Sequence, residues 1–336
     1  MTNKVSFVSL DNGFKDPDQN KIRKHWMEDR RDALADIAEL DTPVLVINEE
    51  SINEAAFNLL NIKNISSVLT DVSANSDKNV LNRLNLLKTD FYCNGLNDLK
   101  SLKAVLPDIL NYRIVLNISA GSDCKKIPED CAVAFEIYNT EKFDAIKNTN
   151  CQKLYSISLD CSDIDALPNK IGQIKFLHNP QADFGILLKL DNNNNLEHSL
   201  WIKELEDILY DIIYDFPNIN FTILNSDYLL AGSGAILCRV TDVSTENGRQ
   251  LIKVNLKNQL LPDLQILHSE IVCLSRKSAD GHIMSRFMFE DDSQLHKQTS
   301  PPASVGDIIL IPHAGIVQGV DIKYLKSRRV CTVCGL

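Results

Sequence analysis

The feature that most constrains the fold is a regular alternation of short apolar segments with amphipathic segments over residues 44–224. Short segments rich in apolar and β-branched residues predict strands, and apolar residues spaced three and four apart predict helices. The predicted strands are 44–47, 67–71, 90–93, 113–117, 133–137, 153–159, 186–190 and 220–224. The predicted helices are 25–38, 52–60, 77–87, 96–105, 140–148 and 196–214. Strand and helix in turn predict βα units, which build a parallel sheet and, with this many repeats, a barrel.

The pattern changes after residue 227. Five segments predict strands of alternating or apolar type, separated by turns with Gly, Asn or Pro and without a strong helix between them. They are 228–240, 251–256, 266–274, 283–289 and 307–311. We therefore expect an α/β chain of three parts, with an N-terminal arm and helix over 1–41, a βα barrel over 42–227 and an antiparallel β domain over 228–336.

Charge and composition exclude several classes of partner. The chain has 35 basic and 45 acidic side chains, a formal net charge of −10, which argues against nucleic acid and against an anionic membrane surface. The N-terminus has no apolar signal region, and no run approaches the about 18 apolar residues of a membrane span. Nine cysteines without a disulfide-scaffold spacing indicate reduced thiols. These features predict a cytoplasmic protein.

Short motifs, in order over roughly residues 40–325, resemble those of the fold-type III amino-acid decarboxylases that depend on pyridoxal phosphate (PLP), such as ornithine and diaminopimelate decarboxylases. Residues 42–47 match the opening TPxYVYD, and residues 71–75 fall where the family has AVKAN. Four later segments resemble the motifs FDVASxxELxxAL (91–102), VDSxxEL (134–143), KFGI (183–186) and GDxLxxxxAGAY (306–315). The resemblance implies a TIM-like barrel and a β domain that also receives the strand before the barrel, here 43–47. It also implies head-to-tail dimers with active sites at the seam.

The length of one segment departs from this family. Only about 40 residues separate Gly185 from Asn225, fewer than the family uses there. We therefore expect at least one βα unit to be missing or shortened, and the barrel to be incomplete or distorted.

The residues around the family's cofactor depart as well. Ser73 stands where the family has the lysine that forms a Schiff base with PLP, and a hydroxyl cannot form an imine. Asp71, expected on the same strand face, would repel a phosphate. Leu224 and Asp227 replace the acid and the arginine of the family's EPGR loop, and no two glycines are adjacent to form its GGG phosphate loop. We predict from these changes that the chain uses no PLP and is catalytically inactive.

The same alignment gathers polar side chains at the mouth of the barrel. The candidate pocket residues are Asp71, Ser73, Asn75, Asn94, His178, Asn225 and Asp227. His178 is either a remnant of the family's ring-stacking histidine or a surface or strand-end histidine without a role in a site. Because this lining is acidic and polar, we expect a small polar or cationic ligand. We also expect the chain to form a homodimer, or a heterodimer with a decarboxylase-like subunit that it regulates or completes.

Three alternatives stay open. A divergent PLP-dependent decarboxylase or racemase would carry its lysine elsewhere, although Lys78, on the following helix, is expected to point into solvent. A PLP-free enzyme would use Asp71, Asp227 and His178 for acid–base chemistry. A plain interaction protein would use the barrel as a scaffold alone.

A CxxC pair, Cys331 and Cys334, lies at the end of the sequence. Two thiols are half of the four ligands that a structural zinc ion needs, and the sequence has no second CxxC or CxxH to complete a site. We interpret them as residues of a final strand, with metal binding the weaker hypothesis.

Overall fold

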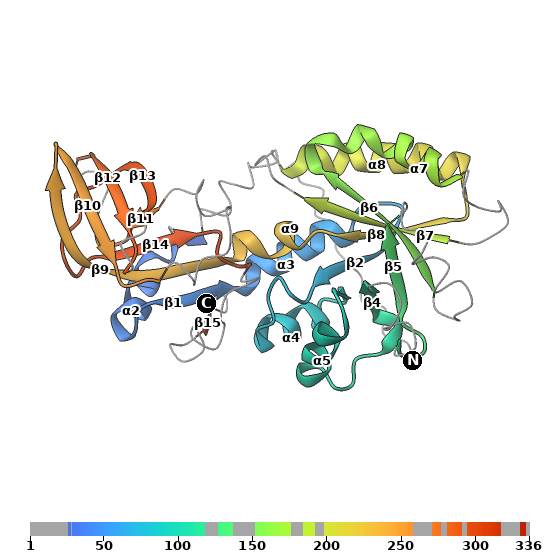
Figure 1. Cartoon of the computed structure of the whole chain (residues 1–336), viewed down its shortest axis with the longest axis horizontal. Helices are drawn as coiled ribbons and strands as arrows, with labels where there is room; N and C mark the ends of the chain where they lie inside the picture. The colour runs from blue at the N-terminus through green and yellow to red at the C-terminus, as the bar shows by residue number, and fades with distance from the viewer. Residues whose placement is uncertain are drawn as a thin grey trace, which may run out of the picture.

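The computed structural model describes residues 26–27, 29–117, 127–136, 152–175, 184–191, 198–257, 271–276, 281–290, 294–316 and 330–333. These residues form a parallel barrel and a β domain that lie at opposite ends of an elongated molecule (Figure 1). Helices α3 (Glu49–Leu60) and α9 (Ser226–Leu230) lie side by side between the two parts, where Asn58 Nδ2 donates to the Tyr228 hydroxyl at 3.1 Å. No helix in the described residues is long and apolar enough to cross a membrane.

Seven parallel strands form the barrel. They are β2 (Ile65–Asp71), β3 (Asp90–Cys93), β4 (Ile114–Asn117), β5 (Ala132–Glu136), β6 (Lys153–Asp160), β7 (Phe184–Asp191) and β8 (Ile219–Leu224). Each lies within two residues of a predicted strand. Pairing of β8 with β2 closes the ring, so the predicted barrel is confirmed, and it closes with seven strands in the described part of the chain. The short segment after Gly185 therefore leaves the ring intact.

Helices and short 3₁₀ turns connect these strands. The α-helices are α2 (Arg31–Leu40), α3 (Glu49–Leu60), α4 (Lys78–Leu86), α5 (Leu96–Val105), α7 (Leu167–Lys175), α8 (His198–Asp215) and α9 (Ser226–Leu230). The 3₁₀ helices are η1 (Asn111–Arg113), η3 (Cys161–Ala166) and η4 (Ala231–Ser233). Asp77 caps α4, as its Oδ1 accepts the Asn79 N–H at 2.8 Å. The predicted helix at 140–148 lies outside the described residues.

Two helices were not predicted from the sequence. Pro168 and Gly172 lower the helix propensity of α7, yet proline is tolerated in a first turn and the helix buries Ile171 and Ile174. The strand predicted over 228–240 is wrong over its first part, because α9 and η4 occupy 226–233. The side chain of Asn225 accepts the Tyr228 N–H at 2.9 Å and starts α9.

The β domain is one mostly antiparallel sheet. It contains β9 (Gly234–Glu246), β10 (Arg249–Val254), β11 (Val272–Cys273), β12 (Ile283–Met288), β13 (Gln294–Ser300) and β14 (Ile308–Pro312), joined by β1 (Val44–Asn48) and β15 (Val330–Val333). Strand β1 pairs antiparallel with β9 and parallel with β15. β13 was not predicted, and of the strand predicted over 266–274 only the two residues of β11 are a strand within the described part.

The interior of the barrel is filled by side chains, so the barrel is a packed core. A cluster of buried residues points inward from the strands: Leu69, Tyr92, Val115, Ala132, Ala134, Leu154, Leu187 and Leu224. Side chains alternate along a strand, so the residues two positions further on point to the same side and reach the mouth of the barrel. These positions are where a site can form.

Candidate functional site

A pocket of about 200 Å³ opens at the carboxyl ends of the barrel strands. This is the end at which loops following the strands build active sites in βα barrels. Its lining is Asp71, Ala74, Tyr92, Asn94, Ser158, Lys189, Leu190, Asp191, Leu224, Ser226, Asp227 and Ile316. The lining combines three carboxylates with one ammonium group, and it comes from elements spread over most of the chain.

Asp71, the last residue of β2, is the centre of a hydrogen-bonded group on one side of the pocket. Its Oδ1 accepts the N–H of Ser73 at 2.8 Å and the hydroxyl of Ser73 at 2.7 Å, and its Oδ2 accepts Asn94 Nδ2 at 2.7 Å. Its own N–H donates to the Ser226 hydroxyl at 2.8 Å. Burial raises the pKa of the Asp71 carboxyl, and the donors from Ser73 and Asn94 oppose that rise.

Lys189 projects from β7 into the barrel mouth. It lies two residues beyond the inward-pointing Leu187, at the level of Ser158 on β6 and Leu224 on β8. Its Nζ lies 4.8 Å from the centroid of the Tyr92 ring, which comes from β3. A cation over an aromatic face is attracted by the electrons of the ring. The side chain of Lys189 therefore extends from β7 across the interior toward β3, and its amine lies within the mouth of the barrel.

Further carboxylates lie beyond Lys189 along the rim. Burial, and then the neighbouring Asp160, raise the pKa of the Asp191 carboxyl, while the charge of Lys189 lowers it. The buried thiol of Cys161 has a pKa raised to about 12, first by burial and then by Asp160, Asp191 and Asp227. The rim is thus an acidic environment that disfavours additional negative charge.

Among the residues predicted for the pocket, Asp71, Asn94 and Asp227 line it together. Ser73 contacts Asp71 and Asn94, but the expectation that it shares a strand face with Asp71 is wrong. β2 ends at Asp71, and residues 72–74 form a turn in which the Asp71 carboxylate accepts the Ser73 N–H.

The two buried asparagines among the predicted pocket residues, Asn75 and Asn225, form structural hydrogen bonds outside the pocket. Asn75 donates to the Gly315 carbonyl at 2.8 Å and so joins the barrel to the chain after β14. Asn225 starts α9 and points to the Sγ of Cys161 at 3.9 Å. His178 and Cys334 lie outside the described residues. Cys331 is in β15, opposite Val46 of β1, and no group of three or more metal-ligating side chains forms among the residues described.

The sequence reasoning missed Tyr92, Ser158, Lys189, Asp191 and Ser226. A signal for two of them was present. In the apolar segment 184–191, the charged residues Lys189 and Asp191 are two apart, at the carboxyl end of a predicted buried strand. Two residues that are two apart in a strand place their side chains on the same face. Charged side chains are seldom buried, so two of them on the face that forms the interior of a barrel indicate a functional site.

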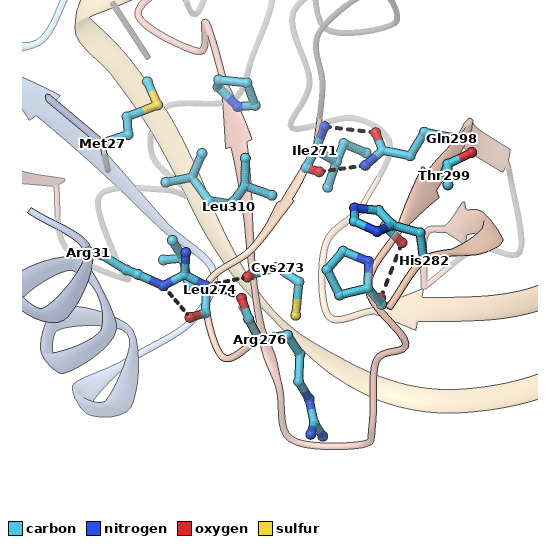
Figure 2. Close-up of a pocket in the computed structure, with 14 residues that line it drawn as sticks. Met27, Arg31, Ile271, Cys273, Leu274, Arg276, His282, Gln298, Thr299 and Leu310 are labelled. Atoms are coloured by element: carbon cyan, nitrogen blue, oxygen red, sulfur yellow. Dashed lines mark hydrogen bonds between the residues drawn. The ribbon is translucent and has the colours of Figure 1, made fainter. Parts of the chain in front are cut away.

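A second pocket of about 160 Å³ lies in the β domain, beside α2 (Figure 2). Two of its polar side chains, Arg31 and Gln298, are hydrogen-bonded to the protein itself. Arg31 donates to the carbonyl oxygens of Leu274 at 2.9 Å and Cys273 at 2.8 Å, and also to that of Arg276. Gln298 forms a pair of hydrogen bonds with the backbone of Ile271, at 2.5 and 2.8 Å. These contacts fix α2 and β11 in place, and we assign the candidate site to the barrel mouth.

No family model and no curated protein matches the chain by sequence. Solved structures do match its fold. The arginine decarboxylase of Paramecium bursaria Chlorella virus bound to agmatine has a TM-score of 0.65 at 11% identity, covering 94% of this chain and 100% of its own. The lysine decarboxylase of Selenomonas ruminantium has 0.69 at 13%, covering 91% and 95%. The diaminopimelate decarboxylase of M. jannaschii in complex with L-lysine has 0.70 at 14%, covering 89% and 88%.

These matches correct the prediction that the chain has no cofactor. The shared fold is that of PLP-dependent decarboxylases, which points to PLP as the cofactor. The prediction rested on the residues at aligned positions, namely Ser73, Asp71, Leu224 and Asp227, and on the absence of adjacent glycines. It did not consider side chains from other strands, although the interior of a barrel is reached from every strand.

The described lining fits the aldehyde end of PLP, since Lys189 supplies the amine that reacts with an aldehyde. Around the phosphate end, the described lining residues offer no second cation beside Asp71, Asp191 and Asp227. The chain therefore has the fold of the PLP-dependent amino-acid decarboxylases, with a lysine at the mouth of its barrel.

Proposed function

We propose that the chain is a decarboxylase-like protein that binds a small cationic amine or amino acid at the mouth of its barrel. The observation that carries this proposal is the charge of the pocket. Asp71, Asp191 and Asp227 line it together with the ammonium of Lys189, so a ligand that brings positive charge meets net negative charge. A carboxylate of an amino-acid ligand would have Lys189 as its partner.

The ligands of two structural neighbours support the same class. The arginine decarboxylase was solved with agmatine and the diaminopimelate decarboxylase with L-lysine, both of which carry amines. Ser158, Asn94 and Ser226 add hydroxyl and amide groups that can orient such a ligand by hydrogen bonds. The face of Tyr92 adds an apolar surface that also attracts cations.

Titration calorimetry with agmatine, cadaverine and L-lysine tests this proposal. We expect binding that Asp191→Asn weakens by about tenfold, which corresponds to about 1.4 kcal/mol. The matched control is Asp163→Asn, because Asp163 is an exposed aspartate on η3 that does not line the pocket. Equal affinity in the two variants, or no binding of any of the three amines, would contradict the proposal.

A second candidate is a decarboxylase that acts on the same ligand, and the specific observation in its favour is Lys189. Bound PLP would supply an electron sink for a carbanion formed on loss of carbon dioxide. The residues of this chain would hold the substrate: Asp191 and Asp227 would bind its side-chain cation. Release of carbon dioxide from carboxyl-labelled arginine, lysine and diaminopimelate separates this candidate from the catalytically inactive binder that the sequence predicts.

We also propose that the chain pairs with itself or with a decarboxylase-like subunit. The shared fold supports this, since the resemblance found in the sequence implies dimers with sites at their seam. Light scattering coupled to gel filtration tests self-association, and a mass of a single 37.7 kDa chain at every concentration would contradict the homodimer.

A further inference from the structure

The pocket in the β domain has the opposite charge to the mouth of the barrel (Figure 2). Its described lining contains the guanidinium groups of Arg31 and Arg276 and the imidazole of His282, and no aspartate or glutamate. From this contrast and from the position of Arg31, we propose that the pocket binds a small monocarboxylate with a short apolar body. This second site does not depend on the amine site at the barrel mouth.

Arg31, the first residue of α2, carries the charge that a carboxylate would meet. Its Nε and Nη2 donate to the carbonyl oxygens of Leu274 at 2.9 Å and Cys273 at 2.8 Å. Carbonyl groups hold a guanidinium in place, but they carry no net charge that would neutralise it. The other guanidinium, that of Arg276, forms an ion pair with Asp307, with Nε 2.8 Å from Oδ2. Arg31 has no carboxylate partner among the residues that the structure describes.

One nitrogen of the Arg31 guanidinium remains available to a ligand. Arginine has five N–H donors, and Nη1 of Arg31 donates to no described group. In Figure 2, Nη1 points away from the two carbonyl oxygens that the rest of the guanidinium binds. Hydrogen bonds from a charged donor to a carboxylate are among the strong ones. Because the carbonyls already fix the side chain, a carboxylate on Nη1 would not have to immobilise it.

Apolar side chains form much of the remaining lining and set the kind of body that the ligand carries. Met27, Ile271 and Leu310 are buried, and Pro301 and Pro312 lie at the same pocket. The pocket has a volume of about 160 Å³, the space of about five water molecules at about 30 Å³ each. This volume suits a carboxylate on a chain of about three to five carbon atoms, which buries its chain against the apolar side chains.

The methyl group of Met27 reports on this pocket, because its side chain is buried and part of the lining. The full-length chain has four methionines, so ¹³C-labelled methionine methyl groups give a simple spectrum in which Met27→Leu assigns the signal. We expect isovalerate to shift the Met27 signal in a saturable titration, with a Kd on the order of 1 mM. The methyl group of Met284, which is exposed and does not line the pocket, is expected to keep its shift.

Thr299→Glu tests whether the pocket recognises negative charge. Thr299 is an exposed residue of β13 in the lining, so a glutamate there adds charge without a change in the core. We expect it to weaken isovalerate binding by at least about threefold, since like charges repel. The matched control is Thr245→Glu, at an exposed position of β9 outside the lining, which should bind as wild type does. Arg31→Gln removes the cation itself, and in folded protein it should weaken binding by at least about tenfold.

Acetate and isopentylamine separate the two parts of the ligand. Acetate keeps the charge without the chain, isopentylamine keeps the chain with the opposite charge, and each should bind at least about threefold more weakly than isovalerate. Equal affinity for either one would overturn the proposal. An unshifted Met27 signal well above the expected Kd, or equal affinity in wild type and Thr299→Glu, would overturn it as well. Circular dichroism establishes that each variant is folded, so a loss of binding is not a loss of structure.

Discussion

Lys189 of β7 and Tyr92 of β3 meet inside the barrel, with the Nζ of the lysine 4.8 Å from the centre of the tyrosine ring. The two strands are not neighbours in the ring, since β8 and β2 lie between them on one side. The contact therefore spans the mouth and holds a cation over it. It also connects the apolar layer of the interior, to which Tyr92 belongs, with the charged layer of the pocket.

The strength of this contact can be measured by a double-mutant cycle. We expect Tyr92→Leu and Lys189→Met, singly and together, to give a coupling free energy of unfolding of about 0.5–2 kcal/mol, the range of partly buried cation–π pairs. Urea denaturation of the four proteins provides the measurement. Tyr92→Phe keeps the aromatic face and should keep the coupling; a coupling of zero with Tyr92→Leu would mean that the two side chains do not interact.

The Asp71 carboxyl should make the stability depend on pH. Its pKa in the folded chain is above the usual 3.8, mainly because it is buried, so the folded state binds its proton more tightly than the unfolded state. The stability that this proton provides is present below pH 3.8 and is lost as the pH rises through the raised pKa. Between pH 4 and 7, Asp71→Asn should therefore show a weaker fall in stability than wild type.

Urea midpoints measured at half-unit pH steps test this effect. The control is Asp163→Asn, whose curve should run parallel to that of the wild type, because Asp163 is exposed. An Asp71→Asn curve that is parallel to wild type would show that the proton on Asp71 is bound equally in both states.

The side chain of Asn75 should contribute to the free energy of unfolding, because it joins the barrel to the chain after β14. Its side chain is fully buried, donates to the Gly315 carbonyl at 2.8 Å, and accepts the Asp77 N–H at 3.0 Å. Asn75→Ala leaves both backbone groups without these partners and should cost about 1–3 kcal/mol of unfolding free energy. Asn79→Ala, on the exposed side of α4, should change it by less than about 0.5 kcal/mol. Equal effects would exclude this role for Asn75.

Two glycines should respond in opposite directions to the same substitution. A Cβ on Gly315 would overlap the carbonyl of Leu230, which is backbone and cannot move away freely, and it would crowd the Ser233 hydroxyl. Gly315→Ala should therefore destabilise by about 3 kcal/mol or more. A Cβ on Gly172, in α7, meets nothing within 4 Å, and Gly172→Ala should stabilise by about 0.4–1 kcal/mol. Thermal unfolding measures both, and a neutral Gly315→Ala would mean that the backbones are further apart.

The Cys161 thiol should be unreactive in the folded protein. Its pKa is raised to about 12, so at pH 8 about one molecule in ten thousand carries the thiolate that alkylating agents attack. We expect no modification by iodoacetamide until guanidinium chloride is added, as read by peptide mass spectrometry. Ser162→Cys places a thiol at the adjacent exposed position and should react rapidly. Equal rates at the two positions would show that Cys161 is accessible.

Local sequence patterns determined the elements of the barrel and of much of the second sheet. Each barrel strand has a contiguous apolar segment, and Asn48 and Asp77 mark the starts of helices by capping backbone N–H groups, so both signals are local. Where the prediction failed, the local signal was weak. The α9 helix has five residues, and it is held by Asn225 and by burial of Tyr228, Leu229 and Leu230 between the two parts of the molecule.

The residues of the candidate site also fall into those that the sequence predicted and those that it did not. Motif order was enough to place Asp71, Asn94 and Asp227 at the ends of strands, because parallel strands end at one rim of a barrel. The position of the amine was decided by tertiary structure. In the sequence, Lys189 is one of two charged residues at the end of an apolar strand. It becomes part of the pocket only because closure of β8 onto β2 brings β7 within reach of Tyr92. A distance across a closed ring depends on residues far apart in the chain, and no local pattern contains it.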